Sequence, residues 1–194
     1  MSVGSFNGPT LRYAGYDIKT GQIVHTHSRF SVAENRYVEI PIDELKARFS
    51  TEPFIVSKLT GQDPKNLDFV AVTDGGGSAG IPLMVDTAQR KLVPRPSLQL
   101  TTKKPRFAGD GTDSAQIDIA VVDRHGKTIG SAGGKVKVTA TRGKLSAPGG
   151  IVDLAKGRAT VTLTSVNETV DEVHVAVTSL DAPYTADHLV LAFL

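Results

Sequence analysis

Cysteine is absent from this sequence of 194 residues. Its absence excludes disulfide bridges, cysteine metal ligands and thiol nucleophiles. Tryptophan is also absent and aromatic residues make up only 6% of the chain, so the stacking surfaces that bind single-stranded nucleic acids are lacking. The formal net charge is only +2, and the charges are spread along the chain rather than gathered in a basic patch. We therefore expect no nucleic-acid partner.

Long apolar segments are also missing. No run approaches the ~20 residues that a membrane-spanning helix needs. The first six residues, Met1 to Phe6, lack the basic segment and apolar core of a signal peptide. The sequence therefore predicts cytoplasmic synthesis without a signal peptide and without membrane insertion. Its hydrophobic content of 40% is enough for a packed core, and its length suits one large domain or two small ones.

The first 80 residues predict a small α+β domain made of a hairpin, a helix and a strand. Gly21 ends the hairpin turn, where a positive φ is needed. Pro53 cannot lie inside an unbroken helix, so it predicts a kink or the first turn of a second helix. The expected elements are strands at 11–18 and 22–30, amphipathic helix from 42 to about 59, and a strand at 67–73.

A glycine-rich run follows, from Asp74 to Gly80. Because glycine loses much conformational freedom on ordering, such a run is typical of a linker or loop. The alternative, a phosphate-binding loop, needs a helix directly after it, whereas residues 81–85 favour an extended chain. Residues 81–96 therefore predict a second hairpin and a linker that Pro94 and Pro96 stiffen.

Residues 97–194 predict an all-β sandwich. Short segments with alternating apolar side chains recur at regular intervals and are separated by glycine and proline turns, which is the pattern of a two-sheet fold. In the segment 114–122, Ile117 and Ile119 alternate with Gln116 and Asp118. The expected strands are 97–102, 114–122, 135–141, 144–147, 159–165, 171–179 and 187–194.

Several motifs in this half of the chain carry a family resemblance. They are Gly109 to Ser114, Val122-Asp123 with Gly126, Gly143 to Ser146, Lys156 to Ser165 and Val173 to Val177. With these motifs in this order, residues 97–194 resemble the bacterial Ig-like domains of invasin- and intimin-type adhesins, which are also common in phage virion proteins. The segment from Ile151 to Leu154 departs from the family pattern, which has a threonine-rich segment there.

The resemblance implies a non-catalytic structural or binding protein. Such domains serve as spacers in surface adhesins or as decoration modules on phage capsids, head fibres and tails. Because the expected protein lacks a signal peptide, we favour a virion accessory over its alternative, a bacterial adhesin module at the cell surface. The expected partners are other protein subunits in a homo-oligomer or a virion or surface assembly, with a cell-surface glycan as a further candidate.

His25 and His27 are the strongest metal candidates. They lie two residues apart on the expected strand 22–30, so both imidazoles point to the same face. A transition-metal site needs further ligands, and the sequence does not place Glu34, Glu39 or His125 beside them. This pair supports the alternative of a metal-dependent enzyme or regulator. The more common role is that of two partly exposed strand histidines.

Four side chains in the predicted sandwich loops are candidates for ligand binding: Asp110, Asp113, Asp123 and Tyr184. Aspartates gathered at one end of a sandwich, with help from Asp181 and Asp187, would supply oxygen ligands for calcium. Aspartate in such loops more often accepts hydrogen bonds from its own backbone. Tyr184 offers an aromatic ring to a sugar, or it anchors its loop.

No catalytic residue is predicted. The sequence has no Gly-x-Ser-x-Gly nucleophile elbow between a strand and a helix, and nothing singles out a pair of carboxylates for glycoside hydrolysis. We therefore expect that the protein is not an enzyme and has no resident cofactor. Calcium and a transition metal are the only candidate ligands of this kind.

Overall fold

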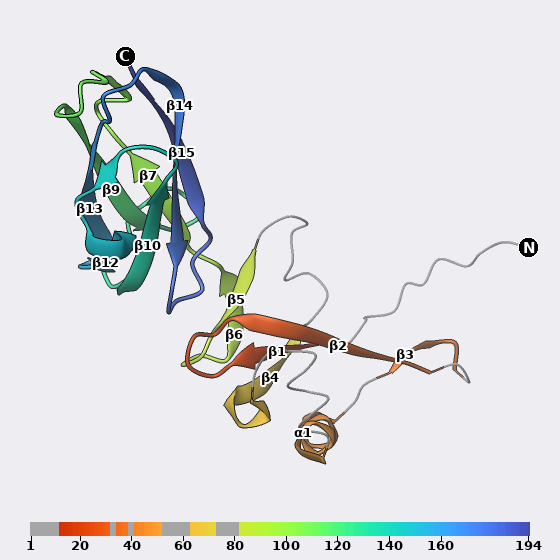
Figure 1. The fold of residues 1–194 in the computed structure, drawn as a ribbon. Coiled ribbons are helices and arrows are strands. Elements are labelled where there is room, and N and C mark those ends of the chain that lie inside the picture. Colours follow the sequence, from red (N-terminus) through yellow and green to blue (C-terminus); the bar gives the residue numbers. More distant parts are fainter. Residues whose placement is uncertain (1–11, 32–33, 39–40, 52–62, 73–81) are drawn as a thin grey trace, which may run out of the picture. The chain divides into compact units, whose positions relative to one another are not determined.

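The structure is a computed structural model that describes residues 12–31, 34–38, 41–51, 63–72 and 82–194 (Figure 1). Contacts between Cα atoms divide the chain into two compact units, Met1–Pro94 and Arg95–Leu194. The predicted second helical segment at 52–59 and the glycine-rich run at 74–80 lie outside the described residues. Strands dominate both units, and the second unit contains the predicted sandwich.

An antiparallel sheet with the order β3-β2-β1-β4 forms the centre of the N-terminal unit. The predicted hairpin is confirmed, since β1 pairs with β2 across a turn in which the Asp17 carboxylate accepts hydrogen bonds from the backbone N–H groups of Lys19 and Thr20. Gly21 has a φ of 71°, as the turn pattern predicts. The strands are β1 (Arg12–Asp17), β2 (Ile23–Ser31), β3 (Arg36–Val38) and β4 (Leu67–Val72).

The helix α1 (Ile42–Thr51) packs on this sheet by its apolar stripe. Leu45 of α1 is fully buried against Tyr13 of β1 and Phe69 of β4. Asp63 caps the short 3₁₀ helix η1 (Pro64–Asn66), which leads into β4. The predicted second hairpin is present as β5 (Leu83–Asp86) and β6 (Lys91–Pro94).

Polar contacts to the Asp68 carboxylate connect β1, β4, α1 and the β5–β6 turn, and we call this group of residues the Asp68 cluster. Asp68 of β4 accepts contacts from Lys46 Nζ of α1 and from Arg90 Nη2 of the β5–β6 turn, both at 2.8 Å. The Tyr16 hydroxyl of β1 donates to the same carboxylate at 3.3 Å. Burial opposes ionisation of Asp68, but the hydrogen bonds from Lys46 and the Phe69 N–H outweigh it, so the pKa of Asp68 lies below its ordinary value.

Asp68→Asn should therefore destabilise the N-terminal unit by about 1–3 kcal/mol, because it leaves two cations without their carboxylate. The depressed pKa means that this stability is present above the unfolded value of 3.8 and is lost as the pH falls below it. Denaturant unfolding followed by circular dichroism measures the change. Lys65→Ala is the control, since Lys65 is exposed and makes no ion pair with Asp68. Equal stability of Asp68→Asn and Lys65→Ala would contradict the role of the cluster.

The C-terminal unit is a sandwich of two sheets, with the orders β12-β10-β14-β15-β8 and β11-β13-β9-β7. All neighbouring strands are antiparallel except β8 and β15, which are parallel. The elements are β7 (Ser97–Thr101), β8 (Arg106–Phe107), β9 (Ser114–Val122), β10 (Gly134–Ala140), β11 (Lys144–Leu145), η2 (Pro148–Gly150), β12 (Ile151–Leu154), β13 (Arg158–Thr164), β14 (Val170–Ser179) and β15 (Asp187–Phe193).

The core of the sandwich lies between the two sheets and consists of aliphatic side chains with two phenylalanines. The predicted alternation is confirmed in β9, where Ile117 and Ile119 are buried while Gln116 is exposed. Phe107 and Phe193 pack edge to face with their ring centroids 5.0 Å apart. All 17 buried members of this core come from residues 98–193, so the unit contains its own hydrophobic core.

Two strands of the sandwich are absent from the sequence prediction. The segment Ile151–Leu154, identified only as a departure from the family pattern, forms β12 and pairs with β10. Arg106–Phe107, for which no strand is predicted, forms β8 beside the C-terminal strand β15. Both are edge strands of four residues or fewer, which are too short for a periodic signal.

Candidate functional site

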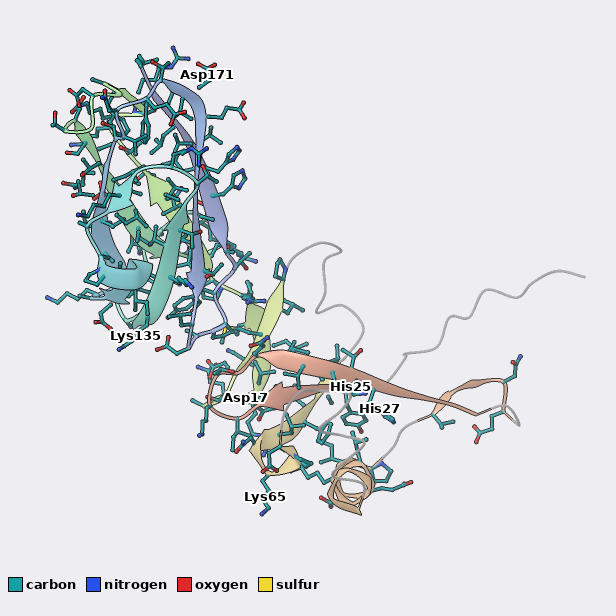
Figure 2. The ribbon with its side chains drawn as sticks, viewed as in Figure 1. Asp17, His25, His27, Lys65, Lys135 and Asp171 are labelled. Atoms are coloured by element: carbon teal, nitrogen blue, oxygen red, sulfur yellow. The ribbon has the colours of Figure 1, made fainter. Side chains whose placement is uncertain are left out.

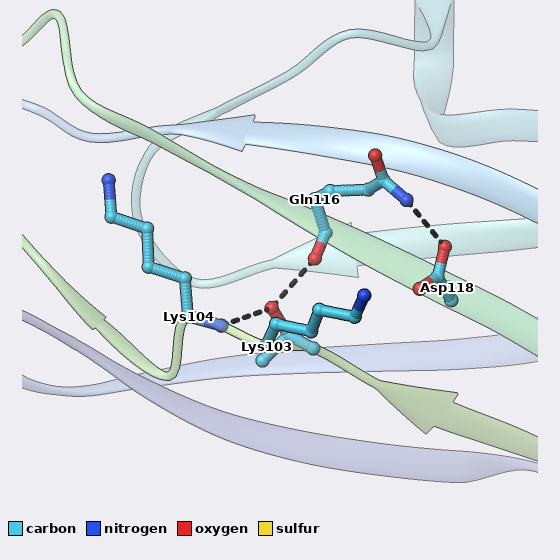
Figure 3. Close-up of a pocket in the computed structure, with 5 residues that line it drawn as sticks. Lys103, Lys104, Gln116 and Asp118 are labelled. Atoms are coloured by element: carbon cyan, nitrogen blue, oxygen red, sulfur yellow. Dashed lines mark hydrogen bonds between the residues drawn. The ribbon is translucent and has the colours of Figure 1, made fainter.

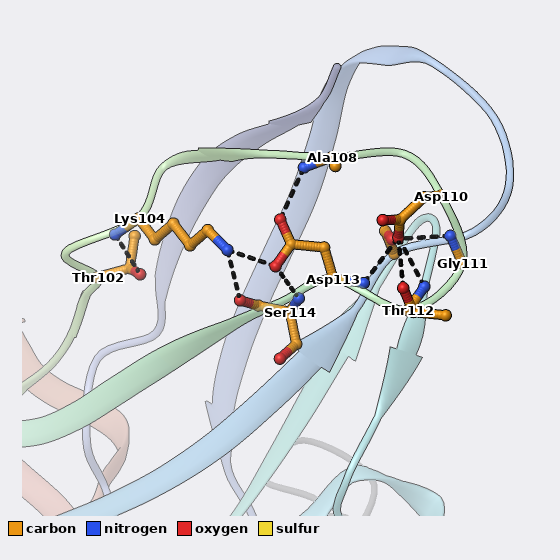
Figure 4. Close-up of polar contacts among 9 residues, drawn as sticks. Thr102, Lys104, Ala108, Asp110, Gly111, Thr112, Asp113 and Ser114 are labelled. Atoms are coloured by element: carbon orange, nitrogen blue, oxygen red, sulfur yellow. Dashed lines mark hydrogen bonds and ion pairs between the residues drawn. The ribbon is translucent and has the colours of Figure 1, made fainter.

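The loop from Ala108 to Ser114 contains two of the predicted binding residues (Figure 4). The Asp110 carboxylate accepts hydrogen bonds from the N–H groups of Thr112 and Asp113, at 2.8 and 2.7 Å, and from the Thr112 hydroxyl at 3.0 Å. These bonds, first that from the Asp113 N–H, lower the pKa of Asp110. The carboxylate therefore shapes the loop by accepting bonds from its own backbone.

Asp113 closes the same loop from the other side. Its carboxylate forms an ion pair with Lys104 and accepts hydrogen bonds from the N–H groups of Ala108 and Ser114, at 2.9 and 2.8 Å (Figure 4). The bond from Lys104, followed by these two, lowers the pKa of Asp113 to about 2. The Lys104 ammonium also lies 5.7 Å from the ring centroid of Phe107, a cation–π contact.

Acid should weaken this loop within a defined range. Because the pKa of Asp113 is depressed, its stabilising contacts are present above the unfolded value of 3.8 and are lost as the pH falls to about 2. Thermal unfolding of the wild type should show a steeper fall in Tm between these two pH values than Asp113→Asn shows. Identical pH profiles for the two proteins would contradict this assignment.

Asp123 lies at the opposite end of β9 from Asp113. Its carboxylate accepts hydrogen bonds from the N–H groups of Lys127 and His125, at 3.0 and 2.8 Å, and these bonds lower its pKa. The nine residues of β9 separate the two aspartates by about 30 Å. The structure therefore brings Asp110 and Asp113 together and leaves Asp123 apart, so the three cannot ligate one calcium ion.

Tyr184 lies in the loop between β14 and β15. Its hydroxyl donates to the Gly133 carbonyl at 2.9 Å, and its own carbonyl accepts from Arg95 Nη2 at 3.1 Å. Burial of its half-covered ring raises the pKa of Tyr184. In the same loop, the Asp181 carboxylate accepts from the Lys135 N–H at 2.8 Å. These bonds hold the loop against the start of β10 and the entry to β7.

His25 and His27 lie on β2 with their ring centroids 6.0 Å apart and leave the strand on the same side (Figure 2). The predicted pairing of the two rings is therefore present. In the described part of the chain, no group of three or more His, Asp or Glu side chains is arranged to hold a metal ion. The metal site at this pair stays a prediction.

Two shallow hollows are candidate ligand sites. One, of about 210 Å³, lies on β9 and the β7–β8 loop and is lined by Thr102, Lys103, Lys104, Gln116 and Asp118 (Figure 3). It is smaller than the ~300 Å³ of usual small-molecule sites. Its lining has no aromatic ring for a sugar, and the Gln116 amide donates to Asp118 at 2.8 Å. The other, of about 350 Å³, lies beside the Asp68 cluster and includes Lys65.

The outer face of the sheet that contains β14 is a surface that the sequence does not predict. The outward side chains of β10, β12, β14 and β15 form a continuous surface, which we call the β14 face. Exposed apolar residues recur across it: Ile151 on β12, Leu180 directly after β14 and Val190 on β15. Only the strand register places these residues on one face, because they come from segments that are distant in the sequence.

No helix within the described residues has the length and apolar character needed to cross a membrane. At one end of the sandwich Asp110 bonds to the backbone of its own loop, and in the loop between β14 and β15 Asp181 bonds to the backbone of β10. The β14 face holds three exposed apolar residues.

Comparison with known proteins identifies the C-terminal unit. A family model described as invasin, domain 3, matches residues 97–190. A 282-residue C-terminal fragment of intimin, solved with the intimin-binding domain of its translocated receptor, is 21% identical over 49% of this chain and 32% of that chain, with a TM-score of 0.40. The Yersinia pseudotuberculosis adhesin InvE is 19% identical over 50% of this chain and 27% of that chain, with a TM-score of 0.38.

A β-glucuronidase of glycoside hydrolase family 2 is 17% identical over 96% of this chain and 19% of that chain, with a TM-score of 0.46. No curated protein matches the sequence. This chain spans 32% of the intimin fragment, 27% of InvE and 19% of the β-glucuronidase. The activities and partners of those whole proteins are therefore not assigned to it. The family match carries the assignment: residues 97–190 form a bacterial Ig-like domain of the invasin and intimin type.

Proposed function

We propose that this chain is a non-catalytic binding protein that displays its Ig-like domain on a phage virion, as a decoration of the capsid, head fibre or tail. The match to an invasin domain supports an adhesion or binding module. The hydrogen bonding of the loop carboxylates is the observation that supports a non-catalytic role. Asp110, Asp113 and Asp123 all accept hydrogen bonds from their own loops instead of facing a shared cavity.

The virion part of the proposal rests on the family resemblance of residues 97–194, since such domains are common in phage virion proteins. We infer in addition that residues 1–80 form an α+β domain that docks on the particle or assembles with other copies. In this arrangement the sandwich is the displayed module. A bacterial surface adhesin is the alternative location for the same kind of module.

Particle purification tests the location. Virions from the strain that carries the gene are banded in a density gradient, and the chain is sought in the band by mass spectrometry. We expect it to co-purify with the capsid proteins after a high-salt wash. Its absence from the particles, together with its accessibility to protease on intact cells, would refute the virion location and support the adhesin.

A metal-dependent role of the N-terminal unit is the second candidate, and the 6.0 Å separation of the His25 and His27 rings favours it. Elemental analysis of the purified protein, compared with a His25→Ala/His27→Ala double variant, tests it. Stoichiometric zinc, copper or nickel that disappears in the variant would establish the site. Equal and negligible metal content in both proteins would remove this candidate.

A further inference from the structure

The two outer faces of the sandwich differ in chemistry. Five large hydrophobic residues are exposed among those that the structure describes, and three of them, Ile151, Leu180 and Val190, belong to the β14 face. The outer face of the other sheet presents polar side chains such as Gln99, Gln116 and Thr160. The large apolar side chains that are exposed on the sandwich therefore lie mainly on one side of it.

The register fixes the order of side chains along this face. Lys137 of β10 lies beside Thr178, and Ala176 lies beside His188 of β15. The next outward row contains His174 of β14 beside Val190 of β15. In the middle row Ala176 also lies beside Thr139 of β10, so two small side chains lie next to each other there.

Charge is divided between the two ends of the face. Lys135 and Lys137 lie at one end, while Asp171 and Glu172 lie at the other, and Figure 2 shows Lys135 and Asp171 at opposite ends of the sandwich. Arg106 of the edge strand β8 lies beside Ala192, two strands away from Glu172. Lys135 makes only an exposed 4.0 Å contact with Asp153, which contributes little. No ion pair is present for Lys137 among the described residues, and Glu172 lies 3.6 Å from His174.

This division makes the face complementary to itself. We propose that the β14 face pairs with the β14 face of a second copy of this chain around a two-fold axis. The axis runs across the strands between the rows of Ala176 and His174, so the strands of the two copies run in opposite directions. It places Ala176 opposite His174 and Thr178 opposite Glu172. Lys137 lies beside Thr178, one strand away on β10, so its long side chain reaches Glu172 of the other copy diagonally.

The apolar residues follow the same symmetry. Val190 of one copy faces the row of His188 in the other, and Leu180 approaches the end of the face near Asp171. A face of four strands, with up to ten residues per strand, measures about 20 Å by about 30 Å, which is enough for a small specific interface. Two-fold symmetry uses every contact twice, as in most homodimers.

The dimer extends the proposed function, because it supplies the protein–protein contact that an assembling module needs. Its test is the oligomeric state of the full chain, measured by sedimentation velocity over a concentration series. We expect a reversible dimer whose dissociation constant rises with salt, since opposite charges meet at both ends of the face.

Charge exchange gives the sharpest version of this experiment. Lys137→Glu and Glu172→Lys should each raise the dissociation constant about tenfold or more, because each places like charges opposite one another twice per dimer. The double variant restores the opposite charges and should recover the wild-type constant. Lys144→Glu on the exposed edge of the other sheet is the matched control and should leave the dimer unchanged.

Three results would overturn the proposal: a wild type that stays monomeric at every concentration, a dimer that Lys137→Glu does not weaken, or a double variant that stays as weak as the single ones. A monomer would leave the face to a different protein. Co-purification with virions is measured independently, so failure of the dimer and failure of the proposed function are distinguishable.

Discussion

Replacing Gly150 by alanine is expected to lower the free energy of unfolding of the C-terminal unit by about 3 kcal/mol or more. Gly150 ends η2 with a φ of 72° and directly precedes β12. A Cβ atom there would lie 2.0 Å from the carbonyl oxygen of Val138 in β10. Because the obstacle is backbone of a paired strand, β10 and β12 would have to separate to accommodate the methyl group.

The neighbouring residue provides a matched control. Gly149 also has a positive φ, 61°, but a Cβ atom there would meet nothing within 4 Å. Gly149→Ala should therefore cost only the left-handed strain of about 1–2 kcal/mol. Guanidinium unfolding followed by circular dichroism compares the two variants. Equal losses of stability would show that backbone conformation, and not the close approach of Val138, makes glycine necessary here.

Phe193→Ala is expected to lower the free energy of unfolding of the same unit by about 3–5 kcal/mol. Its ring is fully buried at the end of β15 and packs edge to face on Phe107 of β8. Truncation removes this aromatic pair and leaves a cavity beside β8, the parallel strand at the edge of the sheet. The loss of Phe107 packing should also weaken the cation–π contact with Lys104.

Leu194→Ala is the control for this variant. Leu194 is the next residue, but 62% of its side chain is exposed, so its truncation should change stability by less than about 0.5 kcal/mol. Chemical denaturation measures both variants in parallel. A Phe193→Ala protein as stable as Leu194→Ala would place the hydrophobic core elsewhere.

The sequence predicts the sandwich well where its signal is local. Ile117 and Ile119 alternate with polar residues because β9 lies in the interior of its sheet with one face on the core. Val136 and Val138 repeat the pattern in β10 and are fully buried. Helices and loops rarely show period-2 alternation over seven or more residues, so these strands are found with nearly correct ends.

The short strands β8 and β12 escape prediction because their pairing depends on distant partners. Phe107 pairs in parallel with Phe193, and Ile151 pairs with Lys137. Neither segment is long enough to show a period, and Ile151 remains exposed at the edge. The pairing of these two strands with distant segments decides their structure, and no local pattern in the sequence indicates that pairing.

In the candidate site, too, local contacts are predicted from the sequence and contacts between distant residues are not. The turn-forming roles of Asp110, Asp113 and Asp123 follow from local aspartate chemistry and are visible in the sequence. The ion pair of Lys104 with Asp113 is not, because it closes a loop through side chains nine residues apart. The β14 face is still less accessible, since it combines residues from four strands.

The central claim is that the Ig-like unit is a self-contained module with its own core. Differential scanning calorimetry of the segment 95–194, compared with the full chain, tests this claim most directly. We predict one cooperative transition for the segment, at the temperature at which the corresponding transition occurs in the full chain. A segment without a cooperative transition, or one that melts far below the full chain, would contradict the claim.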